Sequence, residues 1–168
     1  MAIRLLTAAD VDTLVAIWSE YRTAETAAYA RDQGWTREHV ERMLTHPYRR
    51  VAIDPATETV GVFIIHPPAT GEVVFIGTRT AAPLAARRAA DAMLAWGLRR
   101  AVAAGLNRAF GQYIFPPGVD VSQLRAIRYF GGVPGVTRNP DEIDGDGDVR
   151  VTFETSDIPA VIAAVEAR

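Results

Sequence analysis

The chain has 168 residues, of which 49% are hydrophobic and 23% are charged, proportions that are ordinary for a globular domain. Its formal net charge of −2 gives no reason to expect nucleic acid or an anionic membrane as a partner. The absence of cysteine excludes disulfides, thiolate catalysis and cysteine-ligated metals. We therefore expect one domain over residues 1–168, large enough to bury a sizeable core.

Membrane, secretory and metal-binding classes are also disfavoured by the pattern of residues. No apolar run approaches the ~20 residues that a membrane span needs. Met1 leads directly into an amphipathic pattern, so we expect no secretory signal. His39, His46 and His66 are scattered without metal-ligand spacing, so no metal site is predicted from them.

The first 66 residues predict a short strand, two helices and a hairpin. Thr7 and Asp10 form a capping-box pattern at the start of the first helix. The alanine-rich residues 23–32 are expected to continue that helix, and Thr36 can cap the second, which ends before Pro47. Strands are expected at residues 3–6, 50–53 and 60–65, the last two joined by a turn that begins with Asp54 and Pro55.

The centre of the chain predicts a strand at 72–78, a helix at 83–104, a strand at 107–115 and a helix at 121–130. The long helix has an apolar stripe with the spacing of one buried face, comprising Ala86, Ala90, Met93, Leu94, Gly97, Leu98 and Ala101. Arg87, Arg88, Asp91 and Arg99 lie off this stripe and are expected to face solvent. A strand, crossover helix and strand predict two neighbouring parallel strands.

The end of the chain predicts two closing strands, at 133–138 and 149–154, and a short helix at 157–167. The acidic run from Asp144 to Asp148 has the appearance of a calcium loop. Such a loop needs glycine at its sixth place and glutamate at its twelfth, where this chain has Val149 and Thr155. We therefore expect a hairpin turn and no metal there.

This order of elements resembles that of the Gcn5-related N-acetyltransferase (GNAT) family over nearly the whole chain. The segment from Arg125 to Val133 is similar to the family's Ala-x-x-x-Tyr-x-x-x-Gly-Phe segment, in a shortened form. The resemblance implies an α/β fold with a mixed central sheet of about seven strands, flanked by helices on both faces.

The family's phosphate loop, Gln/Arg-x-x-Gly-x-Gly/Ala, uses glycines to bring backbone amides around the pyrophosphate of coenzyme A. The matching residues 81–90 contain no glycine, and Pro83 removes one amide donor. Arg79, Arg87 and Arg88 can still supply positive charge to a phosphate, or they form a solvated helix face. We accordingly expect no cofactor, and no acetyl-CoA affinity tighter than roughly 1 mM.

Two residues correspond to the family's catalytic positions. Tyr129 matches, to within one residue, the tyrosine that protonates the departing thiolate in relatives, and Glu72 lies where some relatives place a general base. Alternatively, Tyr129 is a half-buried packing anchor and Glu72 is a solvated carboxylate.

The missing glycines lead to a second resemblance, to degenerate acetyltransferase-like internal virion proteins of tailed phages. It is carried by residues 75–78, by Arg87 and Arg88, and by residues 126–131. It implies a non-catalytic assembly protein with other protein subunits as partners, located in the cytoplasm or the virion. The alternative is an acetyl-CoA-dependent N-acetyltransferase that acts on an unidentified amine.

The virion interpretation depends on one further expectation. Phe115 and residues 116–119 form an apolar segment stiffened by two prolines. We expect this segment to be buried, either closing the protein's own cleft or meeting a neighbouring chain.

Overall fold

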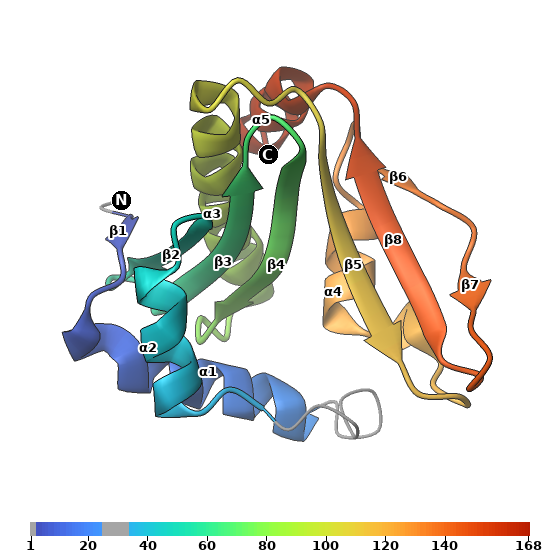
Figure 1. Ribbon diagram of the computed structural model, residues 1–168, viewed down its shortest axis with the longest axis horizontal. Helices are drawn as coiled ribbons and strands as arrows, with labels where there is room; N and C mark the ends of the chain where they lie inside the picture. Colours follow the sequence, from blue (N-terminus) through green and yellow to red (C-terminus); the bar gives the residue numbers. More distant parts are fainter. Residues whose placement is uncertain (1–2, 25–33) are drawn as a thin grey trace.

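The structure is a computed structural model that describes residues 3–24 and 34–168. Within these residues an eight-stranded mixed sheet has the order β1-β2-β3-β4-β5-β8-β6, with β7 paired to β8. Helices cover both faces of this sheet (Figure 1). The predicted α/β class and mixed sheet are confirmed, with one strand more than the seven expected.

The first half of the sheet is an antiparallel meander. It comprises β1 (Arg4–Leu5), β2 (Arg49–Asp54), β3 (Thr59–His66) and β4 (Thr70–Thr78). Helices α1 (Val11–Ala24) and α2 (Arg37–Thr45) pack on one face, where they enclose a core with Val60, Val62 and Phe75. The predicted hairpin and second helix are confirmed, whereas most of the predicted helical continuation at 23–32 lies outside the described residues.

The opposite face is covered by α3 (Pro83–Ala103), by the short α4 (Arg125–Gly131) and by α5 (Ile158–Glu166). The carboxyl-terminal part of the predicted stripe of α3, from Met93 to Ala101, belongs with Phe63 and Val73 to the larger of the two cores. Ala86 and Ala90, at the start of the stripe, are half-buried and line a cleft described below. One expectation for α3 was wrong, because Asp91 is only 4% exposed. Helix α5 packs against α3, and Tyr129 of α4 donates a hydrogen bond to Asp91, so this residue beside the stripe is buried as well.

The second half of the sheet contains β5 (Ala109–Phe115), β8 (Val149–Thr155) and the two-residue strands β6 (Thr137–Arg138) and β7 (Glu142–Ile143). The predicted helix at 121–130 is divided into a 3₁₀ turn (Val121–Gln123) and α4. The strand expected at 133–138 is much shorter than predicted. The acidic run forms the predicted turn, in which the amide of Gly147 donates to the carbonyl of Asp144 at 3.0 Å.

Strands β4 and β5 are parallel, as predicted, but they pair only at one end. Their single register pair is Glu72 with Phe110, and beyond it the strands diverge (Figure 1). A bulge in β4 accompanies this divergence. Val62 faces Phe75 and Phe63 faces Val73, which leaves Val74 without a partner on β3. The sheet is thereby split into two halves along the line between β4 and β5.

The predicted capping box also forms and gives a pH-dependent contribution to stability. The Asp10 carboxylate accepts from the backbone amide of Thr7 at 2.9 Å and from the Arg4 guanidinium at 2.7 and 2.8 Å. Together these contacts hold the pKa of Asp10 well below its ordinary value, with the hydrogen bond from Arg4 as the largest cause.

Asp10→Asn should lower the free energy of unfolding by about 1 kcal/mol at pH 7. Because the folded pKa is depressed, this stabilisation is present above the unfolded pKa of Asp, about 4, and is lost as pH falls towards the folded pKa. Urea unfolding should therefore give a stability difference between the two proteins that shrinks progressively as pH falls below about 4. A stability difference that is constant between pH 7 and pH 2 would show that the ionised carboxylate contributes nothing.

No helix in the described part of the chain is long and apolar enough to cross a bilayer. The same residues hold no group of three or more His, Cys, Asp or Glu side chains arranged to bind a metal ion.

Candidate functional site: the cleft between β4 and β5

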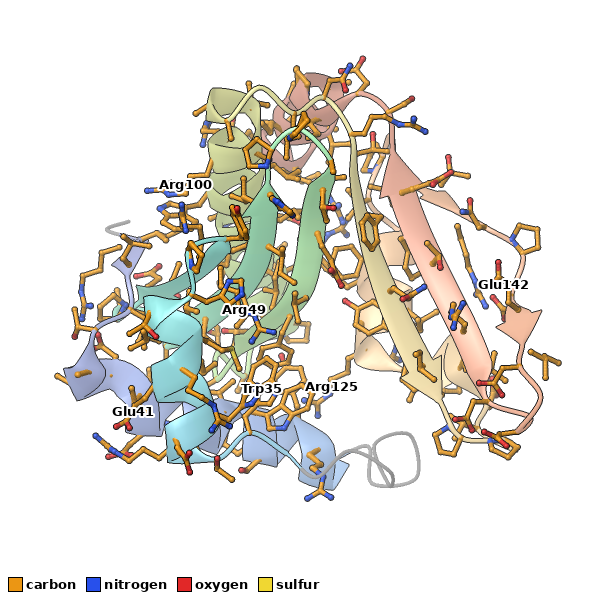
Figure 2. The ribbon with its side chains drawn as sticks, viewed as in Figure 1. Trp35, Glu41, Arg49, Arg100, Arg125 and Glu142 are labelled. Carbon is orange, nitrogen blue, oxygen red and sulfur yellow. The ribbon has the colours of Figure 1, made fainter. Side chains whose placement is uncertain are left out.

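The divergence of β4 and β5 opens a cleft of about 1230 Å³. Its walls include Val74, Ile76 and Thr78 from β4 and residues 112–115 of β5. Side chains from helices on both faces of the sheet complete it, so the cleft extends from one face to the other. Figure 2 labels two of these wall residues, Trp35 from the segment before α2 and Arg125 from α4.

The wall on the side of α1 and α2 is aromatic. Trp18 and Trp35 stack with their ring centroids 4.3 Å apart, and Phe75 meets both edge-on. The hydroxyl of Tyr21 accepts from the amide of Thr78 at 3.1 Å, which fixes the ring beside β4. The guanidinium of Arg125 lies 5.0 Å from the centre of the Tyr21 ring, so α4 contacts α1 across the cleft.

The charge lining the cleft is positive although the whole chain carries −2. Among the described residues, five arginines line it (Arg79, Arg87, Arg125, Arg128 and Arg168) against two acids (Glu20 and Asp148), a formal balance of +3. Such a wall favours an anionic ligand over a cationic one.

The three predicted phosphate-binding arginines differ in their surroundings. Arg79 lines the cleft, but it is held by Glu20 at 2.7 Å and by Glu58 at 2.9 Å. Arg87 is exposed and lines the cleft, whereas Arg88 is exposed and lies outside the lining. Of these three arginines, only Arg87 both lines the cleft and has, within the described part of the chain, no ion pair that holds it away from a ligand.

The amino end of α3 forms part of the cleft wall through Pro83 and Ala86. Its N-cap residue is Ala82, which provides no side-chain cap. The first amides of a helix have no partner within the helix, so those that follow Pro83 are available to an anion. The helix therefore offers donors even though the segment has no glycine.

Tyr129 lines the cleft, and its hydroxyl donates to Asp91 Oδ1 at 2.9 Å. Burial, followed by the neighbouring Asp91 carboxylate, raises the pKa of Tyr129 strongly, so the phenol stays protonated at neutral pH. The ring is also half-buried against the larger core, so both predicted interpretations, anchor and acid, are compatible with its position.

Glu72 is not among the residues that line the cleft. It lies at the paired end of β4, opposite Phe110, and burial raises the pKa of its carboxyl group while nearby Arg49 opposes that effect. The structure therefore does not bring Glu72 and Tyr129 together at one site.

The predicted burial of residues 115–119 is confirmed only for part of the segment, which includes Val119, half-buried against the larger core. Phe115 is buried and Pro116 is half-buried, and both line the cleft. Pro117 and Gly118 are exposed, because the chain turns outward after β5. The cleft beside this loop remains open and is large enough for a coenzyme.

Several solved structures whose descriptions call them acetyltransferases have a similar fold. A protein from Desulfovibrio desulfuricans, assigned by its description to the GNAT family, superposes with a TM-score of 0.63 at 16% identity, over 94% of this chain and 98% of that chain. The fold is that of the GNAT acetyltransferases.

Two further similar structures contain coenzyme A. An aminoglycoside 6′-N-acetyltransferase complexed with coenzyme A gives a TM-score of 0.68 at 12% identity, over 94% of this chain and 97% of that chain. The spermidine N-acetyltransferase of Vibrio cholerae, in complex with coenzyme A and spermine, gives 0.59 at 11% identity, over 91% and 93%. No protein-family model and no curated protein matches the sequence.

Two cleft-associated residues were missed by the sequence analysis. Asp91 was assigned to solvent, and Arg168 was not considered. Asp91 has Arg87 four residues before it, which is the usual spacing of an exposed helical ion pair, so the local pattern favoured the wrong interpretation. Only the packing of distant elements around α3 reveals that Arg168 lines the cleft and that Asp91 is buried beside it.

Proposed function

We propose that the protein is an N-acyltransferase that takes an acetyl group from acetyl-CoA. The observation that carries the proposal is the open, positively lined cleft at the split between β4 and β5. Its size and charge suit a ligand with a long neutral arm and several phosphates. The expectation that no cofactor binds rested on the missing glycines, and the open cleft next to the amino end of α3 is the observation set against it.

Different residues of the cleft would bind different parts of acetyl-CoA. Arg87 and the uncapped amino end of α3 would hold the phosphates. The bulge at Val74 disrupts the ladder where β4 borders the cleft, and a backbone amide freed in this way can donate to the thioester carbonyl oxygen as charge develops on it.

Tyr129 would protonate the departing thiolate. The phenol is protonated at neutral pH and therefore has a proton to give, and its hydroxyl hydrogen would turn from Asp91 towards the cleft. The amine nitrogen would attack the thioester carbonyl carbon, so that a C–N bond forms as the C–S bond breaks. The thiolate would take the proton of the phenol, and the proton lost by the amine would return to the phenolate through water.

The absence of cysteine allows a direct assay of this function, because a thiol reagent detects only the coenzyme A that is released. With acetyl-CoA and a panel of primary amines, the protein should release thiol above the enzyme-free rate. Tyr129→Phe should lower kcat by about 10²-fold or more.

Stability of Tyr129→Phe should be measured alongside, because the variant also removes the hydrogen-bond donor of buried Asp91, a loss of about 1–3 kcal/mol. No thiol release with any amine would contradict the proposed function. Full activity in Tyr129→Phe would contradict only the assigned role of the phenol.

A second candidate is the non-catalytic assembly role that the phage resemblance implies. The lack of glycine at 81–90 and the engagement of Arg79 by Glu20 and Glu58 favour it, since both weaken the usual phosphate site. The exposed Pro117 and Gly118 beside an open cleft remove its main physical support.

A further inference from the structure

A buried polar cluster, Asp91–Tyr129–Arg168, lies at the α3–α4 wall of the cleft. Tyr129 and Arg168 line the cleft, and Asp91 contacts both. The side chain of Asp91 is 5% exposed and that of Arg168 is 14% exposed. Three separate elements, α3, α4 and the segment after α5, therefore bring one anion, one phenol and one cation together.

The cluster has unused hydrogen-bonding capacity among the described residues. Arg168 Nε lies 3.6 Å from Asp91 Oδ2, which is an ion pair but too long for a hydrogen bond. The Nε and Nη1 atoms of Arg168 and the Oδ2 atom of Asp91 are buried and have no hydrogen-bond partner. Buried donors of a guanidinium are costly to leave unpaired, so such a group is expected to meet a polar partner when the cleft is filled.

We propose that Arg168, held in place by Asp91, is a binding residue of the cleft that donates to a carbonyl oxygen of the pantetheine arm of coenzyme A. This rests on the proposed function and assigns a contact within the same cleft. A guanidinium offers only donors, so its partner must be an acceptor oxygen. Asp91 neutralises the cation and orients it, which makes Asp91 a positioning residue.

The position of the cluster favours a carbonyl oxygen of the pantetheine arm, rather than a phosphate, as the partner of Arg168. Asp91 lies eight residues into α3 from Pro83, and a rise of 1.5 Å per residue places it about 12 Å along the axis from the amino end. The amino end, with Arg87 nearby, is where an anion is best held. A ligand with its phosphates there would extend its uncharged arm along α3 towards Arg168.

The test compares two ligands by calorimetric titration. Coenzyme A contains the pantetheine arm, and adenosine 3′,5′-bisphosphate contains the nucleotide and its phosphates without the arm. Arg168→Gln should weaken coenzyme A binding about tenfold, the worth of one charged hydrogen bond, and leave binding of the bisphosphate unchanged. Asp91→Asn keeps an acceptor for Tyr129 but loses the ion pair, so it should weaken coenzyme A binding about threefold and likewise spare the bisphosphate.

Arg42→Gln is the matched control, because Arg42 pairs with Glu38 on the outer surface of α2 and does not line the cleft. Unchanged coenzyme A binding in Arg168→Gln would overturn the assigned contact while leaving the proposed function intact. An equal loss for both ligands would also overturn it, by showing that Arg168 acts on the phosphates. A wild-type protein that binds no coenzyme A would contradict the proposed function and the contact together.

Discussion

Gly97→Ala is expected to lower the free energy of unfolding by about 2–3 kcal/mol, although alanine is normally the better helix former. Gly97 lies in α3 where the ring of Phe63 packs directly on the helix backbone. A Cβ atom added at Gly97 would come closer than 3.0 Å to three atoms of that ring. Phe63 is 2% exposed and surrounded by the larger core, so it has no room to withdraw.

Gly131 supplies the control for this change, since it also lies in a helix, α4, but has nothing within 4 Å of an added Cβ. Gly131→Ala should be neutral or stabilising, by up to about 1 kcal/mol. Urea unfolding of the two variants measures the difference. Equal stability of both would show that the close packing of Phe63 on α3 is not present in solution.

Local patterns predicted most of the fold. The stripe on α3, the capping box at Thr7 and Asp10, and the turn after Asp54 each depend on residues close in sequence, and each predicted element is present. The bulge at Val74 could not be predicted from the sequence. The run from Val73 to Ile76 is apolar throughout, so it has no alternation of apolar and polar residues that an extra residue would interrupt.

The candidate site was predicted less well than the fold, because it depends on packing between distant elements. Tyr129 and Arg87 do line the cleft, whereas Glu72 does not. The apolar composition of residues 115–119 predicted burial, but a turn that leaves the sheet exposes Pro117 and Gly118 whatever their composition. The burial of Asp91 follows only from α4 and α5 covering that side of α3.

The central claim is that coenzyme A binds in the cleft between β4 and β5, and a substitution that fills the cleft tests it most directly. Ala86 is half-buried and lines the cleft, whereas neighbouring Ala85 is exposed and does not. Both lie in the first turns of α3, so tryptophan at either position affects the helix itself to a similar degree.

Calorimetric titration measures the affinity of coenzyme A for three proteins, the wild type and the two tryptophan variants. The wild type and Ala85→Trp should bind with micromolar affinity, equivalent to about 8 kcal/mol, and Ala86→Trp should bind at least about 100-fold more weakly because its indole occupies the ligand's space. Wild-type affinity no tighter than about 1 mM, or equal binding by both tryptophan variants, would contradict the claim.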